Sequence, residues 1–301
     1  MELLDNAAIR IFAGPLLGAL GLGLVLRLAG GAGSGRRIAG SGRRIAGAGI
    51  GLAFAWSAAM VFGAPAIPPA PGPDALVSAA AAGLIVGVLF DVYAAGEATG
   101  GRWTGWSGWL EWSLILAFGA GWTAWLLDGF GPEVPLVMAL WGLAAFRLRR
   151  VFAKDVDVLA GDALAPLAML MMTAAGLGLV AAAANLESSR DLALALAAAI
   201  AGFVALSLFD RSLRFGLTPI LGAGGGILMI AVRMTDAAPF LIPAVAILGF
   251  ILFADQLFRQ PALARIGGLR WGRFGLIALG AAVPIALAAA AALIGAGFGG
   301  I

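Results

Sequence analysis

The chain is a succession of ten mostly apolar stretches, joined by short connections that hold most of its charged residues. A membrane-spanning helix needs about 20 apolar residues, and most of the stretches reach that length. Hydrophobic residues make up 62% of the chain and charged residues 12%, whereas soluble domains hold about 25% charged residues. The sequence therefore predicts an all-α, polytopic integral membrane protein. Its single transmembrane domain, 1–301, has expected spans at about 9–29, 46–64, 75–95, 109–127, 134–148, 158–182, 191–209, 217–232, 237–257 and 273–297.

The basic residues are distributed unevenly between the two sides that these spans define. Of the nineteen Lys and Arg residues, only Arg10, Arg190 and Arg233 fall on one side. The other sixteen lie in alternate connections, which by the positive-inside rule are cytoplasmic. Ten spans then place both termini on the periplasmic side. Because the basic residues occupy short loops between spans, they indicate topology rather than nucleic-acid binding.

Composition also limits chemistry and location. Cys and His are both absent, which excludes disulfides and a Cys nucleophile and removes the commonest general base. The chain opens with Glu2 and Asp5 rather than a basic region, so we expect the first stretch to be a true span and not a cleavable signal. Usage of Ala, Gly and Arg is typical of a GC-rich bacterial source. The expected location is the bacterial inner (cytoplasmic) membrane, as a multi-pass protein whose first partner is the lipid bilayer.

Acidic residues near the ends of spans are costly to place there and are candidates for function. The topology puts four such places on the cytoplasmic face. Converging carboxylates there could hold Mg²⁺; alternatively, each acid caps a helix or pairs with an adjacent Arg. The four places are Asp91, the cluster Lys154, Asp155, Asp157 and Asp162, the group Asp210, Arg211 and Arg214, and Asp255.

Three further patterns each have two interpretations. The heptapeptide Gly-Ser-Gly-Arg-Arg-Ile-Ala occurs at 33–39 and again at 40–46, either as a tandem duplication in a basic loop or as a loop that binds anionic lipid or phosphate. Trp recurs every third residue from Trp103 to Trp112, which favours an interfacial aromatic belt over a substrate platform. The run Gly222–Gly226 favours close helix packing over a phosphate cradle.

Several segments occur in an order known from one enzyme family. They are Gly-Arg-Arg-Ile-Ala-Gly-Ala-Gly-Ile-Gly-Leu-Ala at 42–53, Gly-Val-Leu-Phe-Asp at 87–91, Asp-Val-Asp-Val-Leu-Ala at 155–160, Leu-Gly-Ala-Gly-Gly-Gly at 221–226 and Asp-Gln-Leu-Phe-Arg at 255–259. From about residue 30 to 290 the chain resembles the polyprenyl-phosphate sugar-1-phosphate transferases. These membrane enzymes move a phospho-N-acetylhexosamine, or phospho-muramoyl-pentapeptide, from a UDP-sugar to undecaprenyl phosphate.

The resemblance implies ten or eleven spans, an external N-terminus and a cytoplasmic magnesium site. By position, Asp91, Asp157 and Asp255 are its candidate catalytic residues, and Asp155 and Asp157 its candidate metal ligands. Phe90 and Ala223 stand where the family has acids, another acid falls on or beside Lys154, and basic residues replace its asparagines. The family's His-rich loop has no counterpart, because the chain has no His. Residues expected to bind substrate or phosphate are Arg36, Arg37, Arg43, Arg44, Arg147, Arg150, Lys154, Arg214 and Arg259.

Three functions follow from these observations. The first is a non-catalytic homologue in cell-envelope polysaccharide biosynthesis, which binds polyprenyl phosphate, another membrane protein or a second copy of itself. The missing acids favour it, because each lost Asp removes a magnesium ligand and its compensating charge. The second is an active, divergent transferase that uses Mg²⁺. The third is a small-solute transporter, which predicts inverted repeats and broken helices.

Overall fold

The structure is a computed structural model, which describes residues 9–31, 46–63, 73–98, 105–127, 129, 133–159, 163–210, 213, 216–260, 263, 266 and 269–298. Every element in this part of the chain is helical. In chain order the elements are η1 (Ile9–Ala13), α2 (Gly14–Gly31), α4 (Ala48–Phe62), α5 (Pro73–Ala98), α6 (Gly105–Leu126), α7 (Glu133–Leu159), α8 (Leu164–Ala183), α9 (Glu187–Phe209), α10 (Leu217–Pro219), η2 (Ile220–Gly224), α11 (Gly225–Ala237), η3 (Pro239–Leu241), α12 (Ile242–Leu248), η4 (Gly249–Arg259) and α14 (Arg270–Phe298).

The all-helical membrane architecture predicted from the sequence is confirmed. Among the described residues, seven helical segments are long and apolar enough to cross a membrane, and α4 is a shorter apolar helix. α6 and α7 are not among the seven. Each of the ten predicted stretches nevertheless coincides with a helix or with a run of consecutive helical elements. The protein is a helical, multi-pass membrane protein.

The boundary between the fifth and sixth stretches differs from the prediction. α7 continues to Leu159, beyond the predicted end at 148, and α8 begins only at Leu164. The reason is local: no Gly or Pro occurs between Gly142 and Gly161, so nothing in the sequence interrupts the helix there. Lys154, Asp155 and Asp157 consequently lie on the last turns of α7 and not at the start of the next span.

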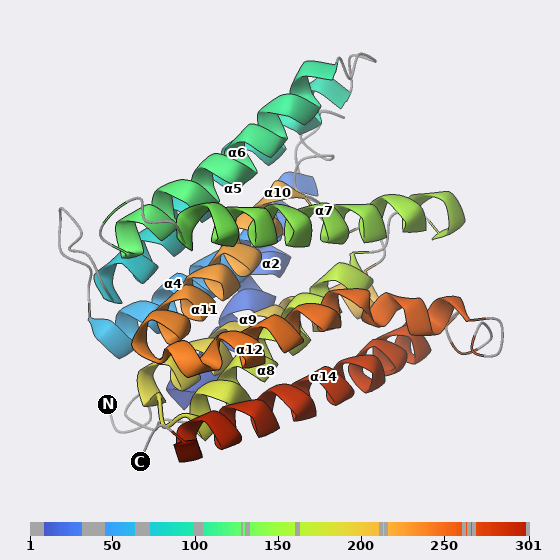
Figure 1. The fold of residues 1–301 in the computed structure, drawn as a ribbon. Helices are drawn as coiled ribbons and strands as arrows, with labels where there is room; N and C mark the ends of the chain where they lie inside the picture. The colour runs from blue at the N-terminus through green and yellow to red at the C-terminus, as the bar shows by residue number, and fades with distance from the viewer. Residues whose placement is uncertain are drawn as a thin grey trace.

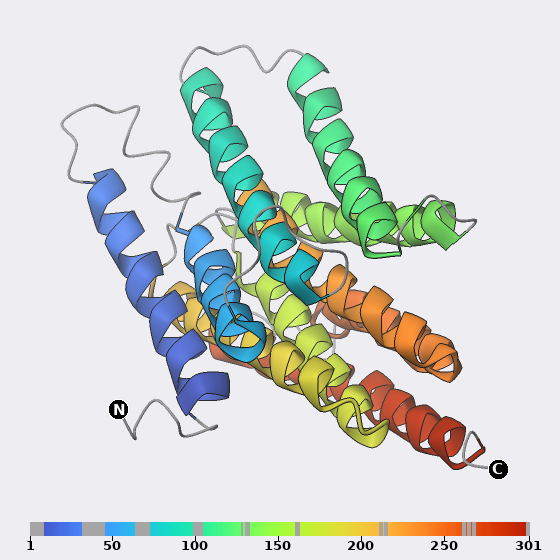
Figure 2. The ribbon, with the colours of Figure 1, turned by 90° about the vertical axis from the view of Figure 1, so that its left-hand side faces the viewer.

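The helices run back and forth, so the beginning of α2 and the end of α14 lie at the same end of the bundle (Figure 1). α5 and α6 stand beside each other at one edge of the bundle, and α7 crosses their direction in both views (Figure 2). We name the two ends of the bundle after α2. The first residues of α2 lie at the "α2 start end". Its last residue, Gly31, lies at the "α2 finish end", together with the start of α4 and the end of α5.

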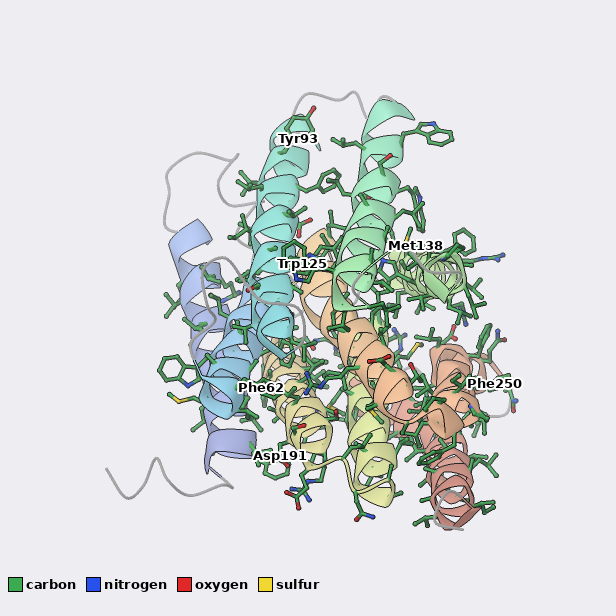
Figure 3. The ribbon with its side chains drawn as sticks, turned by 60° about the vertical axis from the view of Figure 1, so that its left-hand side comes forward. Phe62, Tyr93, Trp125, Met138, Asp191 and Phe250 are labelled. Carbon is green, nitrogen blue, oxygen red and sulfur yellow. The ribbon has the colours of Figure 1, made fainter. Side chains whose placement is uncertain are left out.

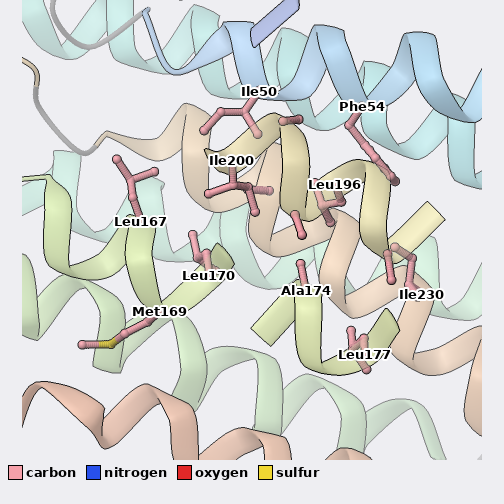
Figure 4. Packing of buried hydrophobic residues seen from close by; sticks show 14 of the residues in the cluster. Ile50, Phe54, Leu167, Met169, Leu170, Ala174, Leu177, Leu196, Ile200 and Ile230 are labelled. Carbon is pink, nitrogen blue, oxygen red and sulfur yellow. The ribbon is translucent and has the colours of Figure 1, made fainter. Parts of the chain in front are cut away.

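The centre of the bundle is formed by α8, α9 and the segment from Leu217 to Ala237. In an 18-residue apolar stretch of that segment 78% of the residues are buried, against 17% in the 18 residues from Ile11 to Leu28. Figure 4 shows Leu170 and Ala174 of α8, Leu196 of α9 and Ile230 of α11 as parts of one cluster of buried apolar side chains. The outer helices, by contrast, carry large exposed apolar side chains, as expected where lipid replaces water.

Glycine allows the backbones of these helices to approach closely. A Cβ on Gly49 of α4 would lie 2.8 Å from the carbonyl oxygen of Ala19 in α2. In the run Gly222–Gly226, a Cβ on Gly225 would lie 2.7 Å from the ring of Phe118. The close packing predicted for this run is confirmed, and part of it has π-helical geometry, at η2.

Candidate functional site

The charged side chains of the described residues are mostly held by partners on other helices. The most extensive arrangement surrounds Asp91, near the end of α5 and 2% exposed. Its Oδ1 accepts a hydrogen bond from the backbone N–H of Leu217 (3.0 Å). Its Oδ2 accepts one from the backbone N–H of Thr218 (2.9 Å) and one from the Thr218 hydroxyl (2.6 Å). Asp91 thus caps the segment that begins at α10, although it belongs to a different helix.

The physical reason for this cap is the free N–H groups at a helix start. The first N–H groups of a helix have no partner within the helix, and they carry partial positive charge. The N-cap residue of α10 is Gly216, which has no side chain and cannot supply the cap itself. Close approach is possible because Gly87 of α5 lies against Thr218: a Cβ on it would be 2.6 Å from the Thr218 Cα.

Arg147 of α7 and Asp255 of η4 form a second buried contact. The Nη2 of Arg147 donates to Oδ1 of Asp255, and the two side chains are 11% and 1% exposed. The Arg147 guanidinium also lies over the ring of Phe253, 5.0 Å from its centroid. Its Nε is buried and has no hydrogen-bond partner among the described residues. Asp255 is therefore paired with a residue 108 positions away along the chain.

A third contact joins α6 to α7 and was not foreseen from the sequence. Glu111 is 4% exposed, and its Oε1 pairs with Nη1 of Arg149. The sequence held a signal for it, because Glu111 is an acid within the fourth predicted span, between Trp109 and Trp112. Trp112 itself packs against Phe146 of α7, with ring centroids 6.2 Å apart. These contacts hold α6 and α7 together on both sides of Leu148.

The end of α9 is held by two arginines from other helices. Asp210, the residue after α9, pairs through Oδ2 with Nε of Arg27 in α2. Arg270 of α14 donates from Nη1 to the carbonyl oxygen of Leu208, at 3.0 Å. Cations are favourable at a helix C-terminus, where carbonyl groups lack partners. Asp210 thus pairs with an arginine that is distant in the sequence.

All of these contacts belong to the half of the bundle toward the α2 finish end. Figure 3 shows Tyr93 and Asp191 at opposite ends of the bundle. Tyr93 follows Asp91 by two residues, and Asp191 lies near the beginning of α9. Near Asp191 the charged contact is a local pair of neighbours, Arg190 Nε and Asp191 Oδ1, at 2.8 Å. The ion pairs that join different helices are therefore concentrated on the side that the charge pattern predicts to be cytoplasmic.

The acids found here do not fit a magnesium site. Mg²⁺ binds through free carboxylate oxygens together with water and phosphate oxygens. Both oxygens of Asp91 already accept hydrogen bonds, and Asp255 lies against the positive charge of Arg147, which disfavours a cation nearby. No group of three or more acidic, His or Cys side chains gathers within the described part of the chain. Asp91 and Asp255 contact different helices, α10 and α7.

The remaining predicted site residues divide into three groups. Arg150 is exposed on α7, three residues beyond the buried Arg147. The second group has a described backbone only, on α7 or η4: Lys154, Asp155, Asp157 and Arg259. The third group lies outside the described residues: Arg36, Arg37, Arg43, Arg44, Asp162 and Arg214. Their roles in binding or catalysis stay predictions.

Comparison of the chain with models of known protein families, with curated proteins and with solved structures gives no match.

Proposed function

We propose that this protein is a non-catalytic homologue of the polyprenyl-phosphate sugar-1-phosphate transferases, which holds a polyprenyl phosphate at the cytoplasmic face of a bacterial inner membrane. One observation carries the proposal. Asp91 and Asp255, the described acids that correspond to the family's acids, are both engaged in joining helices. Asp91 caps a helix and Asp255 neutralises a buried arginine, so each has a structural task that does not need a metal ion.

Basic residues supply the binding part of the proposal. Arg147 and Arg150 lie near the places where the resembling family has asparagines. A guanidinium binds phosphate through two parallel hydrogen bonds, and it keeps its charge at any physiological pH. Arg147 is already paired with Asp255, whereas Arg150 is exposed on the same helix. Arg150 is therefore the described residue best placed to meet a lipid phosphate.

The test measures turnover and binding on the same purified protein. We expect no Mg²⁺-dependent release of UMP from a panel of UDP-N-acetylhexosamines with undecaprenyl phosphate, next to an active transferase as control. We also expect undecaprenyl phosphate to bind, and Arg150→Gln to weaken that binding about tenfold, as for loss of one charge-assisted phosphate contact. Arg190→Gln, near the α2 start end, is the matched control and should bind as the wild type does.

Two results would contradict the proposal in different ways. Release of UMP would mean an active transferase, and Asp91→Asn and Asp255→Asn would then be tested for loss of turnover. If the protein neither turns over substrate nor binds undecaprenyl phosphate, the remaining role is to bind another membrane protein or a second copy of itself. Cross-linking in native membranes would identify that partner.

One observation favours transport of a small solute as a second candidate function. Two consecutive membrane segments are interrupted: Leu217–Ala237 contains the π-helical η2, and Pro239–Arg259 contains the 3₁₀-helical η3 and η4. Transporters often build their sites from interrupted helices. A long 3₁₀ run is uncommon in proteins, and within a helix it often marks a functional hinge. Uptake of a solute panel into proteoliposomes tests this function. Flux that Asp255→Asn abolishes would replace the proposal above.

A further inference from the structure

The segment η4 (Gly249–Arg259) is a 3₁₀-helix of eleven residues. Runs of 3₁₀-helix longer than three or four residues are uncommon, because their hydrogen bonds have poorer geometry than those of an α-helix. The preceding element α12 is α-helical, and the change occurs at Leu248 (φ −61°, ψ −25°) and Gly249 (φ −57°, ψ −26°). These values lie in the 3₁₀ range. The surrounding structure therefore holds η4 in the tighter of the two helices.

The packing of η4 follows a repeat of three residues, as a helix with three residues per turn requires. Along this repeat the buried positions are Ile251 and Ala254, and the exposed positions are Phe250, Phe253 and Gln256. The buried face packs against one glycine of α14: a Cβ on Gly280 would lie 2.6 Å from Cδ1 of Leu257 and 3.2 Å from Cβ of Ala254. Positions three apart lie above one another on a 3₁₀-helix but about 60° apart on an α-helix. The contact with Gly280 therefore fits the 3₁₀ form.

Arg147 of α7 contacts η4 at two positions that the tighter helix brings together. Its Nη2 pairs with Oδ1 of Asp255, and its guanidinium lies 5.0 Å from the centroid of the Phe253 ring. Positions two apart are separated by about 120° around a 3₁₀-helix and by about 160°, almost opposite sides, around an α-helix. A single guanidinium reaches both side chains more readily in the first case. Arg147 therefore stabilises the 3₁₀ form of η4 relative to the α-helical form.

The surroundings of η4 allow its helix type to change. At the junction with α12, nothing lies within 4 Å of the Cβ position of Gly249. In α14, Pro284 has no N–H, so the carbonyl group of Gly280 cannot accept the usual helix bond from position 284. The helix against which η4 packs is therefore weakened at the contact itself. Both ends of the buried face thus adjoin backbone that adjusts at low cost.

We infer that η4 is a two-state element, which the contact of Arg147 with Asp255 and Phe253 holds in the 3₁₀ form and which becomes α-helical when that contact is lost. A 3₁₀-helix rises about 2.0 Å per residue and an α-helix about 1.5 Å, so η4 shortens by about 5 Å in the change. Asp255, six residues after Gly249, turns by about 120° about the helix axis and leaves Arg147. The inference goes beyond the proposed function and does not depend on it, because it rests on the packing of η4 alone.

Distances between pairs of spin labels in the full-length protein test the inference, since the chain has no native Cys. The test pair is Ile242→Cys with Gln256→Cys, and the reference pair is Leu136→Cys with Arg150→Cys on the α-helix α7. All four positions are exposed, and each pair is fourteen positions apart (242 to 256 and 136 to 150). Because the test pair includes most of η4, we expect its distance along the helix to be about 3.5 Å longer than that of the reference pair.

Two matched variants then separate the contact with η4 from a general loosening of the bundle. Arg147→Met should raise the share of a second, shorter distance in the test pair at least about tenfold, as for loss of a coupled buried contact. Arg149→Met makes the same substitution two residues further along α7, at the arginine that pairs with Glu111 of α6, and should leave the distance unchanged. If Arg147→Met does not fold, the double variant Arg147→Met/Asp255→Asn takes its place, because it removes both charges of the pair.

Three results would overturn the inference. A single, unchanged distance in Arg147→Met and in the double variant would mean that η4 is a fixed 3₁₀-helix. An equal change in Arg149→Met would mean that loss of any buried ion pair loosens the bundle. Equal distances for the test and reference pairs in the otherwise unaltered protein would mean that η4 is already α-helical. None of these measurements involves undecaprenyl phosphate or a UDP-sugar, so their failure leaves the proposed function unaffected.

Discussion

Gly216 lies directly against the carboxylate of Asp91: a Cβ at position 216 would be 2.5 Å from Oδ1 and 2.7 Å from Cγ. The absence of a side chain at Gly216 lets a residue of α5 reach the first N–H groups of α10. The neighbouring hydrogen bonds, from Leu217 and Thr218, depend on this approach. Asp91 therefore joins two segments that are more than a hundred residues apart.

Replacing Asp91 by asparagine should destabilise the protein by about 2 kcal/mol, as for loss of a helix cap and of hydrogen bonds to a buried charged group. Asparagine keeps one acceptor oxygen but turns an NH₂ group toward N–H donors. Thr218→Val removes only the hydroxyl hydrogen bond and should cost about 1 kcal/mol. Tryptophan fluorescence during unfolding of the detergent-solubilised protein measures both. Unchanged stability in Asp91→Asn would show that the cap contributes nothing.

The pair between Arg147 and Asp255 should behave as a coupled unit. Asp255→Asn or Arg147→Met leaves a buried charge without its partner, at a cost of about 3–5 kcal/mol each. The double variant should cost clearly less than the sum, with a coupling energy of about 2 kcal/mol. Arg190 and Asp191 are the control, because their side chains are 38% and 24% exposed and such pairs contribute about 0–1 kcal/mol. Additive costs for the buried pair would contradict this contact.

Magnesium should not stabilise the protein. A site with a Kd of 1 mM would add about 1.4 kcal/mol at 10 mM Mg²⁺, which is visible as a shift in the unfolding midpoint. Because the carboxylates of Asp91 and Asp255 are already engaged, we expect the same midpoint with 10 mM Mg²⁺ and with EDTA. A midpoint that rises with Mg²⁺ in the wild type, but not in Asp157→Asn, would place a metal site on the last turns of α7.

The contact between α2 and α4 should tolerate no side chain at Gly49. A Cβ there would lie 2.8 Å from the Ala19 carbonyl oxygen and 2.8 Å from the Gly23 amide nitrogen, and backbone atoms cannot move aside cheaply. Gly49→Ala should therefore destabilise the protein by about 1–3 kcal/mol. Gly21→Ala is the matched control, since nothing lies within 4 Å of its Cβ position. Alanine there should be neutral or slightly stabilising. Equal effects at the two positions would contradict the close packing.

The sequence predicted the helical class and the approximate place of each helix, because long apolar stretches between charged connections have few alternatives. It misplaced the end of α7, where charged residues suggested a loop although no Gly or Pro ends the helix. The apolarity of a segment indicates whether lipid or water surrounds it. Where a helix ends depends instead on residues such as Gly and Pro that interrupt the backbone hydrogen bonds. This is why the charged cluster at Lys154, Asp155 and Asp157 was assigned to the wrong side of a boundary.

The candidate site was predictable only in part. Asp91 and Asp255 were identified from the cost of placing acids near a span. Their partners were not, because Thr218 and Arg147 are 127 and 108 residues away and no local pattern encodes such pairing. Glu111 was missed since the tryptophans around it suggested an interfacial belt. A buried acid needs a partner, so an acid inside a predicted span is itself a reason to search other helices for an arginine.

The direction of the chain across the membrane can be tested with single introduced cysteines, because the protein contains no native Cys that would have to be removed first. Ser34→Cys lies in the connection with four arginines, and Ser188→Cys lies near the beginning of α9. The charge pattern predicts that these positions are cytoplasmic and periplasmic, respectively. In intact cells whose inner membrane is sealed, a membrane-impermeant maleimide should label Ser188→Cys and not Ser34→Cys.

In inverted vesicles the labelling should be reversed, which controls for a cysteine that is merely buried. Labelling of both positions from the same side would mean that the number of crossings between them is even. Within the described part of the chain, α4, α6 and α7 fall short of the length or apolarity of the seven candidate spans. One of them would then fail to cross, and single cysteines placed on either side of α7 would identify it first, because α7 runs across the direction of its neighbours (Figure 1).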